Sequence, residues 1–128
     1  MLRVVVLLVI AAHGIGHILF LVPLLGIADW GQSTTSWLFT GSGIARGVGS
    51  VLWIAALIGF GAAVVGLWSQ QDWWRSAAIL AAVVSIIGLI VFWANPASSS
   101  ALAALVVDLV LLGALLVVHW PPVEALGA

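Results

Sequence analysis

The sequence contains no cysteine and no lysine, and only 5% of its 128 residues are charged. The lack of cysteine excludes disulfides, thiolate metal sites, iron–sulfur clusters and a cysteine nucleophile. Three arginines against four acidic residues give a net charge of −1, so the chain has no basic stripe of the kind that binds nucleic acid. We therefore expect no nucleic-acid partner.

In place of charge the chain carries apolar sequence, with 65% hydrophobic residues and a mean hydropathy of +1.36. Soluble domains are about half apolar and about a quarter charged. A helix needs ~20 apolar residues to cross the ~30 Å of hydrocarbon in a bilayer. The composition therefore predicts an integral membrane protein whose first partner is the lipid bilayer.

Four apolar runs have the length of a membrane-spanning helix, at residues 2–25, 47–69, 74–94 and 101–120. The polar stretch 26–46 is predicted to be one longer outer loop, and the breaker pair Asn95-Pro96 ends the third span. A serine after this pair can cap the fourth helix. Short loops join antiparallel neighbours. The predicted fold class is all-α, an antiparallel transmembrane four-helix bundle that occupies residues 1–128 as one domain.

The arginines predict the orientation of the bundle in the membrane. Arg3 and Arg75 fall on the side of both predicted termini, whereas Arg46 falls on the opposite side. Positive charge is enriched in cytoplasmic loops. We therefore expect the N- and C-termini to be cytoplasmic.

Two histidines one helical turn apart, His13 and His17, lie in the middle of the first apolar run. Counted at the rise of an α-helix, they lie ~16 and ~22 Å from the Arg3 side, and Asp108 in the fourth span lies at ~18 Å. Ser85 in the third span falls at ~12–17 Å by the same count. Ionisable residues at this depth face protein or a cavity and indicate a functional site. The four residues are therefore predicted to form a polar pocket at mid-membrane.

Three interpretations of this pocket remain open from the sequence. The polar residues can form a structural clamp between the first and fourth helices, or a small-ligand or proton-handling site. The third interpretation is a metal ion held by His13, His17 and Asp108, because histidines at i and i+4 share a helical face and a carboxylate completes a facial set. The metal-binding signature with glutamate between the histidines is absent, since residues 14–16 are Gly-Ile-Gly.

A haem with two histidine ligands fits this pattern poorly. The two axial ligands must approach from opposite faces, whereas His13 and His17 point the same way from one helix. The third histidine, His119, is predicted to lie ~20 Å away at the inner boundary. The cofactor is therefore left open, with a metal ion considered and a bis-histidine haem disfavoured.

Other polar and aromatic residues are predicted near the membrane boundaries. Arg46 is a candidate for the outer entrance to the pocket, with Asp29 as its partner, and His119 is a candidate for the inner mouth of a proton path because it follows Asp108 by three turns. The tryptophans are predicted to form an aromatic belt at the span ends: Trp30, Trp37, Trp53, Trp68, Trp73, Trp74, Trp93 and Trp120.

Glycines in the second span predict association between copies of the chain. Gly43 and Gly47, and the series Gly59, Gly61 and Gly66, offer small-residue surfaces for close helix contact. The same residues can serve packing within one chain. We expect a homo-oligomer, or a subunit of a larger membrane complex.

The motifs together resemble a family of uncharacterised, small, four-span bacterial membrane proteins. The likeness lies in His13-Gly14-Ile15-Gly16-His17, Trp37-Leu38-Phe39-Thr40-Gly41, Trp73-Trp74 and Asp108. It implies the same topology and a bacterial inner-membrane location, but no activity. The function expected is non-enzymatic: binding a small ligand, handling protons, or packing in a complex. The alternative is an intramembrane metal-dependent enzyme that uses His13, His17 and Asp108.

Overall fold

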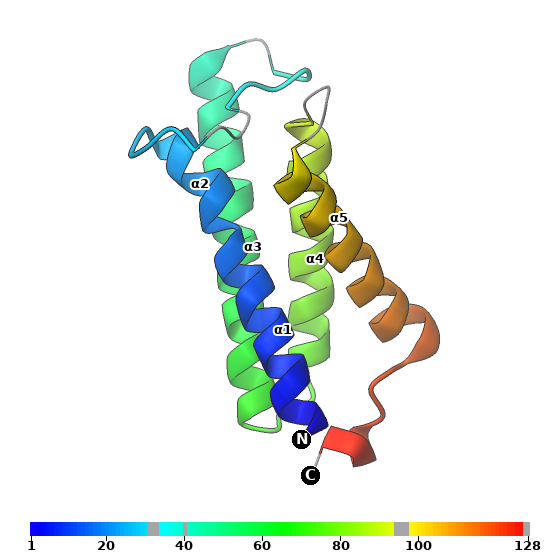
Figure 1. Ribbon diagram of the computed structural model, residues 1–128. Coiled ribbons are helices and arrows are strands. Elements are labelled where there is room, and N and C mark those ends of the chain that lie inside the picture. Colours follow the sequence, from blue (N-terminus) through cyan, green and yellow to red (C-terminus); the bar gives the residue numbers. More distant parts are fainter. Residues whose placement is uncertain (31–33, 40, 94–97, 127–128) are drawn as a thin grey trace.

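A computed structural model describes residues 1–30, 34–39, 41–93 and 98–126, and these residues form helices and loops without a strand (Figure 1). Four helical segments are long and apolar enough to cross a membrane. The predicted fold class, an all-α transmembrane four-helix bundle, is confirmed. Both ends of the chain lie at the same end of the bundle (Figure 1).

The first span consists of two helices, α1 at Leu2–Gly16 and α2 at Ile18–Leu25, which meet at His17. There the amide of His17 donates to the carbonyl of Gly14 at 3.1 Å. This bond spans three residues, so the turn is tighter than the four-residue turn of a regular α-helix. α2 ends at Gly26, whose φ of 75° is a left-handed conformation that glycine adopts without strain.

The second span, α3, covers Ser42–Trp68 and begins five residues before the predicted start at residue 47. The predicted loop 26–46 was therefore too long, and Arg46 belongs to a helix. The prediction took the glycines of this stretch as loop residues. In a membrane protein, however, a helix satisfies its backbone polar groups internally, and the first of these bonds joins the amide of Ala45 to the carbonyl of Gly41 at 2.9 Å.

The last two spans are α4 at Trp74–Val91 and α5 at Ser99–Leu112. α5 continues as a wider π-helical turn, η1, at Gly113–Val118, and a short 3-10 helix, η2, follows at Val123–Leu126. The Oγ of Ser98 accepts from the amide of Ala101 at 3.1 Å, so the predicted serine cap forms. The breaker pair Asn95-Pro96 lies outside the described residues.

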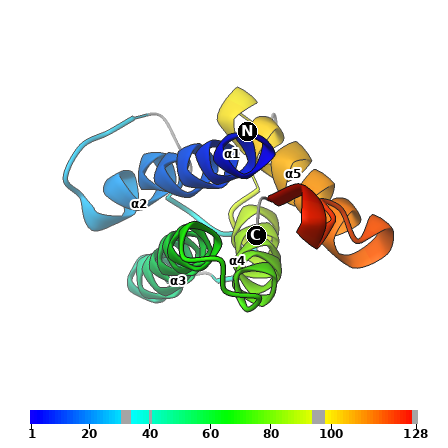
Figure 2. The same cartoon turned by 90° about the horizontal axis from the view of Figure 1, so that it is seen from below.

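α3 and α4 form the centre of the bundle, with α1 and α2 beside α3 and with α5 beside α4 (Figures 1 and 2). Small residues bring the central pair close: a Cβ on Gly59 would lie 2.8 Å from the Cβ of Ala81, and one on Gly88 would lie 2.8 Å from the ring of Trp53. α5 diverges from the other helices toward its C-terminal end (Figure 1). The side of the bundle between α1 and α5 is therefore the less closely packed one.

Two tryptophans of the predicted aromatic belt are buried within the bundle. Trp53 and Trp74 are only 1% and 3% exposed, whereas Trp30, Trp37, Trp68, Trp73, Trp93 and Trp120 are exposed. Trp53 is buried because Gly88 on the facing helix leaves room for its ring. At the other end of α3, a Cβ on Gly66 would lie 2.9 Å from the Cβ of Trp74, so this glycine lets the start of α4 approach closely.

Candidate functional site

The structure brings together four polar side chains from three spans. His13 lies on α1 and His17 at the junction of α1 with α2, while Ser85 lies on α4 and Asp108 on α5. Nε2 of His13 lies 2.6 Å from Oδ1 of Asp108, and Oδ2 of Asp108 lies 2.5 Å from Oγ of Ser85. Nε2 of His17 lies 2.7 Å from the same Ser85 oxygen. We call these four residues the polar cluster.

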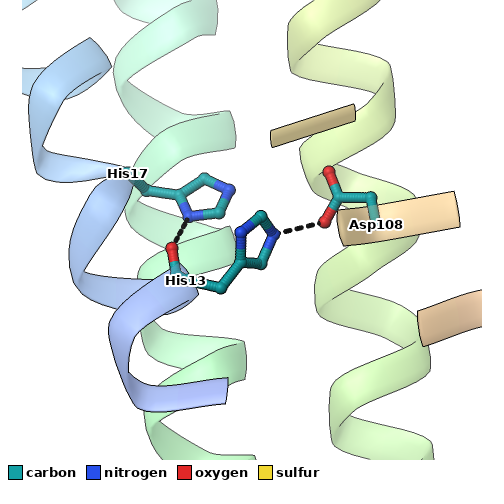
Figure 3. A group of neighbouring side chains, drawn as sticks. All are labelled: His13, His17 and Asp108. Atoms are coloured by element: carbon teal, nitrogen blue, oxygen red, sulfur yellow. Dashed lines mark hydrogen bonds and ion pairs between the residues drawn. The ribbon is translucent and has the colours of Figure 1, made fainter. Parts of the chain in front are cut away.

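The backbone explains why the two histidines take different partners. Nδ1 of His17 donates to the carbonyl oxygen of His13, one turn earlier, at 2.9 Å (Figure 3). This bond directs Nε2 of His17 toward α4, whereas the ring of His13 reaches Asp108 on α5 (Figure 3). The His-x-x-x-His spacing thus links α1 to two different helices.

Aromatic rings pack against the two histidines of the polar cluster. His17, Ser85 and Asp108 are at most 1% exposed. The ring of Phe60 lies 4.9 Å from that of His13 and 5.3 Å from that of His17, and Trp53 lies 5.7 Å from His17 between ring centroids. Phe20 stacks on Trp53. The cluster therefore lies in surroundings of low polarity, where a polar group without a hydrogen-bond partner is costly.

Counting protons limits how the polar cluster can be arranged. A carbonyl only accepts, so Nδ1 of His17 must carry a proton. Ser85 has one hydroxyl proton to share between His17 and Asp108. With no net charge on the cluster, two arrangements satisfy every bond.

In the first arrangement, a protonated Asp108 donates from Oδ2 to Ser85, and Ser85 donates to Nε2 of His17. In the second, a doubly protonated His17 donates to Ser85, and Ser85 donates to an ionised Asp108. Nε2 of His13 donates to Oδ1 of Asp108 in both. The two arrangements differ only in two protons, one moved from Asp108 to Ser85 and the other from Ser85 to His17.

A metal ion suits the same residues less well. The available ligand atoms of His13, His17 and Asp108 lie within 4.8 Å of one another. Ligands around tetrahedral zinc lie closer, at about 3.4 Å for metal–nitrogen bonds of about 2.1 Å. A metal bound to His17 would also displace one of the two hydrogen bonds of its ring. The observed bonds describe a hydrogen-bonded cluster that needs no ion to satisfy it.

A groove reaches the polar cluster from the side of the bundle. It has a volume of about 240 Å³ and lies between α1 and α2 on one side and α5 on the other. His13 and His17 line it, and so do Gly16, Phe20 and Ala104. A small molecule dissolved in the membrane can therefore approach the cluster laterally.

Arg46 and His119 lie away from the polar cluster. The Arg46 guanidinium donates to the carbonyl oxygen of Leu24 at 2.8 Å and so binds the C-terminal end of α2, where a positive charge is favourable. Arg46 also lines a hollow of about 500 Å³ with Asp29, its predicted neighbour.

His119 is exposed and follows η1 in a left-handed conformation. The prediction that His119 follows Asp108 by three turns assumed a regular α-helix up to His119. The wider π-helical turn changes the angular spacing between the two residues. No contact described in the structure joins His119 to the polar cluster.

Sequence reasoning missed the aromatic residues that enclose the polar cluster. Trp53 and Phe60 belong to a series of buried residues on α3 with alternating spacings of three and four: Trp53, Ala56, Phe60, Ala63 and Leu67. This spacing marks one helical face. It was visible in the sequence, but the uniformly apolar background of a membrane helix conceals such a stripe.

Comparison of the chain with known proteins gives no match to a family model, to a curated protein or to a solved structure.

Proposed function

We propose that the protein is a bacterial inner-membrane protein whose polar cluster exchanges a proton with a small molecule bound at mid-membrane. The observation that carries this proposal is the unbroken chain of hydrogen bonds from Asp108 through Ser85 to His17. Each bond in it is short, and all three residues are buried. Such a chain can pass protons between a carboxyl group and an imidazole without a large movement of either group.

The first arrangement, in which Asp108, Ser85 and both histidines are all uncharged, is the resting state in this proposal. We call it the neutral arrangement. Separating a carboxylate from an imidazolium in hydrocarbon surroundings costs free energy that the Ser85 bridge recovers only in part. A protonated Asp108 bonded to neutral Ser85 and His17 avoids this cost. The ion-pair arrangement is then the state that the cluster visits when the groove presents a proton donor or acceptor.

The described hydrogen bonds support exchange with a bound molecule better than conduction across the membrane. Beyond His17, the chain ends at the carbonyl oxygen of His13, which has no proton to pass on. Neither Arg46 nor His119 continues it. The groove beside His13 offers the approach by which a reactant can reach the cluster.

Topology supports the location within this proposal. The first turns of α1 and α4, which contain Arg3 and Arg75, lie at the end of the bundle that carries both termini (Figure 1), whereas the first turns of α3, which contain Arg46, lie at the other end. By the positive-inside rule the termini face the cytoplasm.

Homo-oligomer formation also remains a prediction. Gly59 and Gly66 pack within the chain, whereas a Cβ added to Gly43, Gly47 or Gly61 would meet no atom within 4 Å.

Infrared spectroscopy of the protein in lipid, with isotope-labelled aspartate, tests the proposal. We expect a protonated-carboxyl band that shifts in heavy water and is missing in Asp108→Asn. On titration, this band and the His17 signals should change together, and Ser85→Ala should uncouple them. A carboxyl band that changes independently of His17 in the unmodified protein would contradict a shared proton chain.

A purely structural clamp is the second candidate, because the same bonds join α1, α4 and α5. A clamp requires stable bonds but no proton movement. It predicts that neither the carboxyl band nor the His17 signals respond to pH over the range in which the protein stays folded.

A further inference from the structure

One nitrogen of the polar cluster has no partner within the part of the chain that the structure describes. Nε2 of His13 is bonded to Asp108, whereas no described hydrogen bond involves Nδ1. The described residues contain no buried side-chain nitrogen or oxygen without a partner. Nδ1 of His13 is therefore accessible, although the side chain as a whole is only 8% exposed.

The groove gives this nitrogen a defined neighbourhood. His13 lines the groove of about 240 Å³ between α1 and α5, and the other lining residues are mostly apolar or small. Phe20 contributes an aromatic ring to one wall, and the wall on α5 consists of Ser100, Ala103, Ala104 and Val107. The groove thus combines a mostly apolar lining with the hydroxyl of Ser100 and with the His13 ring, whose Nδ1 has no described partner.

The proton count of the polar cluster sets the polarity of that atom. In both arrangements without net charge, Nε2 of His13 carries the proton that is donated to Asp108. A neutral imidazole carries one proton, so Nδ1 is then an acceptor. A molecule that satisfies Nδ1 must supply a hydrogen-bond donor, and an ether or a ketone cannot do so.

We propose that the groove binds a membrane-dissolved phenol, with its hydroxyl donating to Nδ1 of His13 and its apolar tail in the lipid between α1 and α5. This inference rests on the proposed function, because the same proton arrangement makes Nδ1 an acceptor. It names the class of molecule with which the polar cluster exchanges a proton.

Size and shape select a single ring. A cavity of about 150 Å³ holds benzene, so the groove of about 240 Å³ has room for one substituted ring. The small residues Gly16, Ala103 and Ala104 line the groove together with Phe20. The groove is open on its outer side, so a longer tail remains in the hydrocarbon without loss of burial.

The test uses nitrogen NMR of histidine-labelled protein in lipid nanodiscs, with para-hexylphenol as the probe. Para-hexylanisole is the matched control, since it has the same ring and tail but no hydroxyl proton. We expect saturable binding of the phenol that shifts the Nδ1 resonance of His13, and no saturable shift with the anisole. Dodecanol tests whether the ring matters, and it should bind at least about tenfold more weakly than the phenol.

A pair of variants locates the site. Ala103→Phe fills the groove from its exposed rim and should weaken phenol binding by about tenfold or more, a loss of about 1.4 kcal/mol. Ala55→Phe makes the same change at an exposed position of α3 that does not line the groove, and it should leave binding unchanged. The unshifted His17 resonance in each variant shows that the cluster is intact.

Equal shifts from the phenol and the anisole would overturn the donor requirement, and equal binding of dodecanol would overturn the ring. No saturable binding of the phenol, in protein whose Asp108 and His17 signals still titrate together, would refute this inference and leave the proposed function standing. Loss of that joint titration would instead refute the proposed function.

Discussion

Two substitutions of Asp108 separate the loss of hydrogen bonds from the loss of a movable proton. Leucine at this position removes the partner of both His13 and Ser85. Asparagine keeps both bonds: its oxygen accepts from Nε2 of His13, and its amide donates to Ser85, which then donates to His17. Asp108→Asn therefore reproduces the neutral arrangement of the cluster but cannot release a proton.

The structure sets the size of the difference in stability. In the neutral arrangement, Asp108→Leu leaves the Nε2 proton of His13 without an acceptor and the Oγ of Ser85 without a donor, in a region that is at most 1% exposed for Ser85 and Asp108. An unsatisfied buried polar group costs about 1–3 kcal/mol, while side-chain hydrogen bonds between membrane helices average about 0.6 kcal/mol with a maximum of about 1.7. For two such bonds we expect Asp108→Leu to lower the free energy of unfolding by about 1–3 kcal/mol. Asp108→Asn should lower it by less than about 1 kcal/mol.

Reversible unfolding in bicelles, followed by tryptophan fluorescence, measures both values. A variant with leucine at His13, His17 and Asp108 and alanine at Ser85 is the control, because an apolar replacement of a whole buried network is often close to neutral. It should recover much of the loss caused by Asp108→Leu. An unchanged stability of Asp108→Leu would show that the three helices are not joined through Asp108, and equal losses for leucine and asparagine would refute the neutral arrangement.

Three further predictions concern packing, metal content and topology. Gly14→Leu should destabilise the protein by about 1–3 kcal/mol, because a Cβ at this position would lie 2.8 Å from the Cβ of Phe60, whereas Gly16→Ala meets nothing within 4 Å and should be close to neutral in the same unfolding assay. Elemental analysis of purified protein should find no stoichiometric iron, zinc or copper; one metal per chain that is lost in a His13→Ala/His17→Ala variant would instead support the enzyme alternative. Reporter fusions should place Gln71 in the cytoplasm and Ala28 outside, and the reverse pattern would invert the orientation.

The sequence predicted the four spans and the residues of the polar cluster because both depend on simple rules. Helical rise in a layer of known thickness places His13, Ser85 and Asp108 at similar depths without any knowledge of packing. Their hydrogen-bond partners could not be predicted in this way. Ser85 bridges Asp108 and His17 because of how α4 and α5 are rotated about their axes. This rotation could not be predicted, because both helices are apolar on all sides and so lack a polar face that would indicate it.

Other features could not be predicted correctly from the sequence, for reasons that lie in the local structure. The start of α3 was misplaced because glycine, a poor helix former in water, is tolerated in a membrane helix. The π-helical turn before His119 was not predicted, because nothing in the residues of η1, Gly113–Val118, distinguishes a π-helical turn from an α-helical one. Trp53 was assigned to the membrane boundary by its residue type, although its burial depends on Gly88 of another helix.

Nitrogen NMR of His17 in lipid tests the neutral, hydrogen-bonded cluster most directly. In the neutral arrangement, His17 has one protonated nitrogen, Nδ1, and one bare nitrogen, Nε2, that accepts from Ser85. The same pattern should persist in Asp108→Asn, where no carboxylate can stabilise an imidazolium. Two protonated nitrogens on His17 in the unmodified protein, together with an ionised Asp108, would contradict the account.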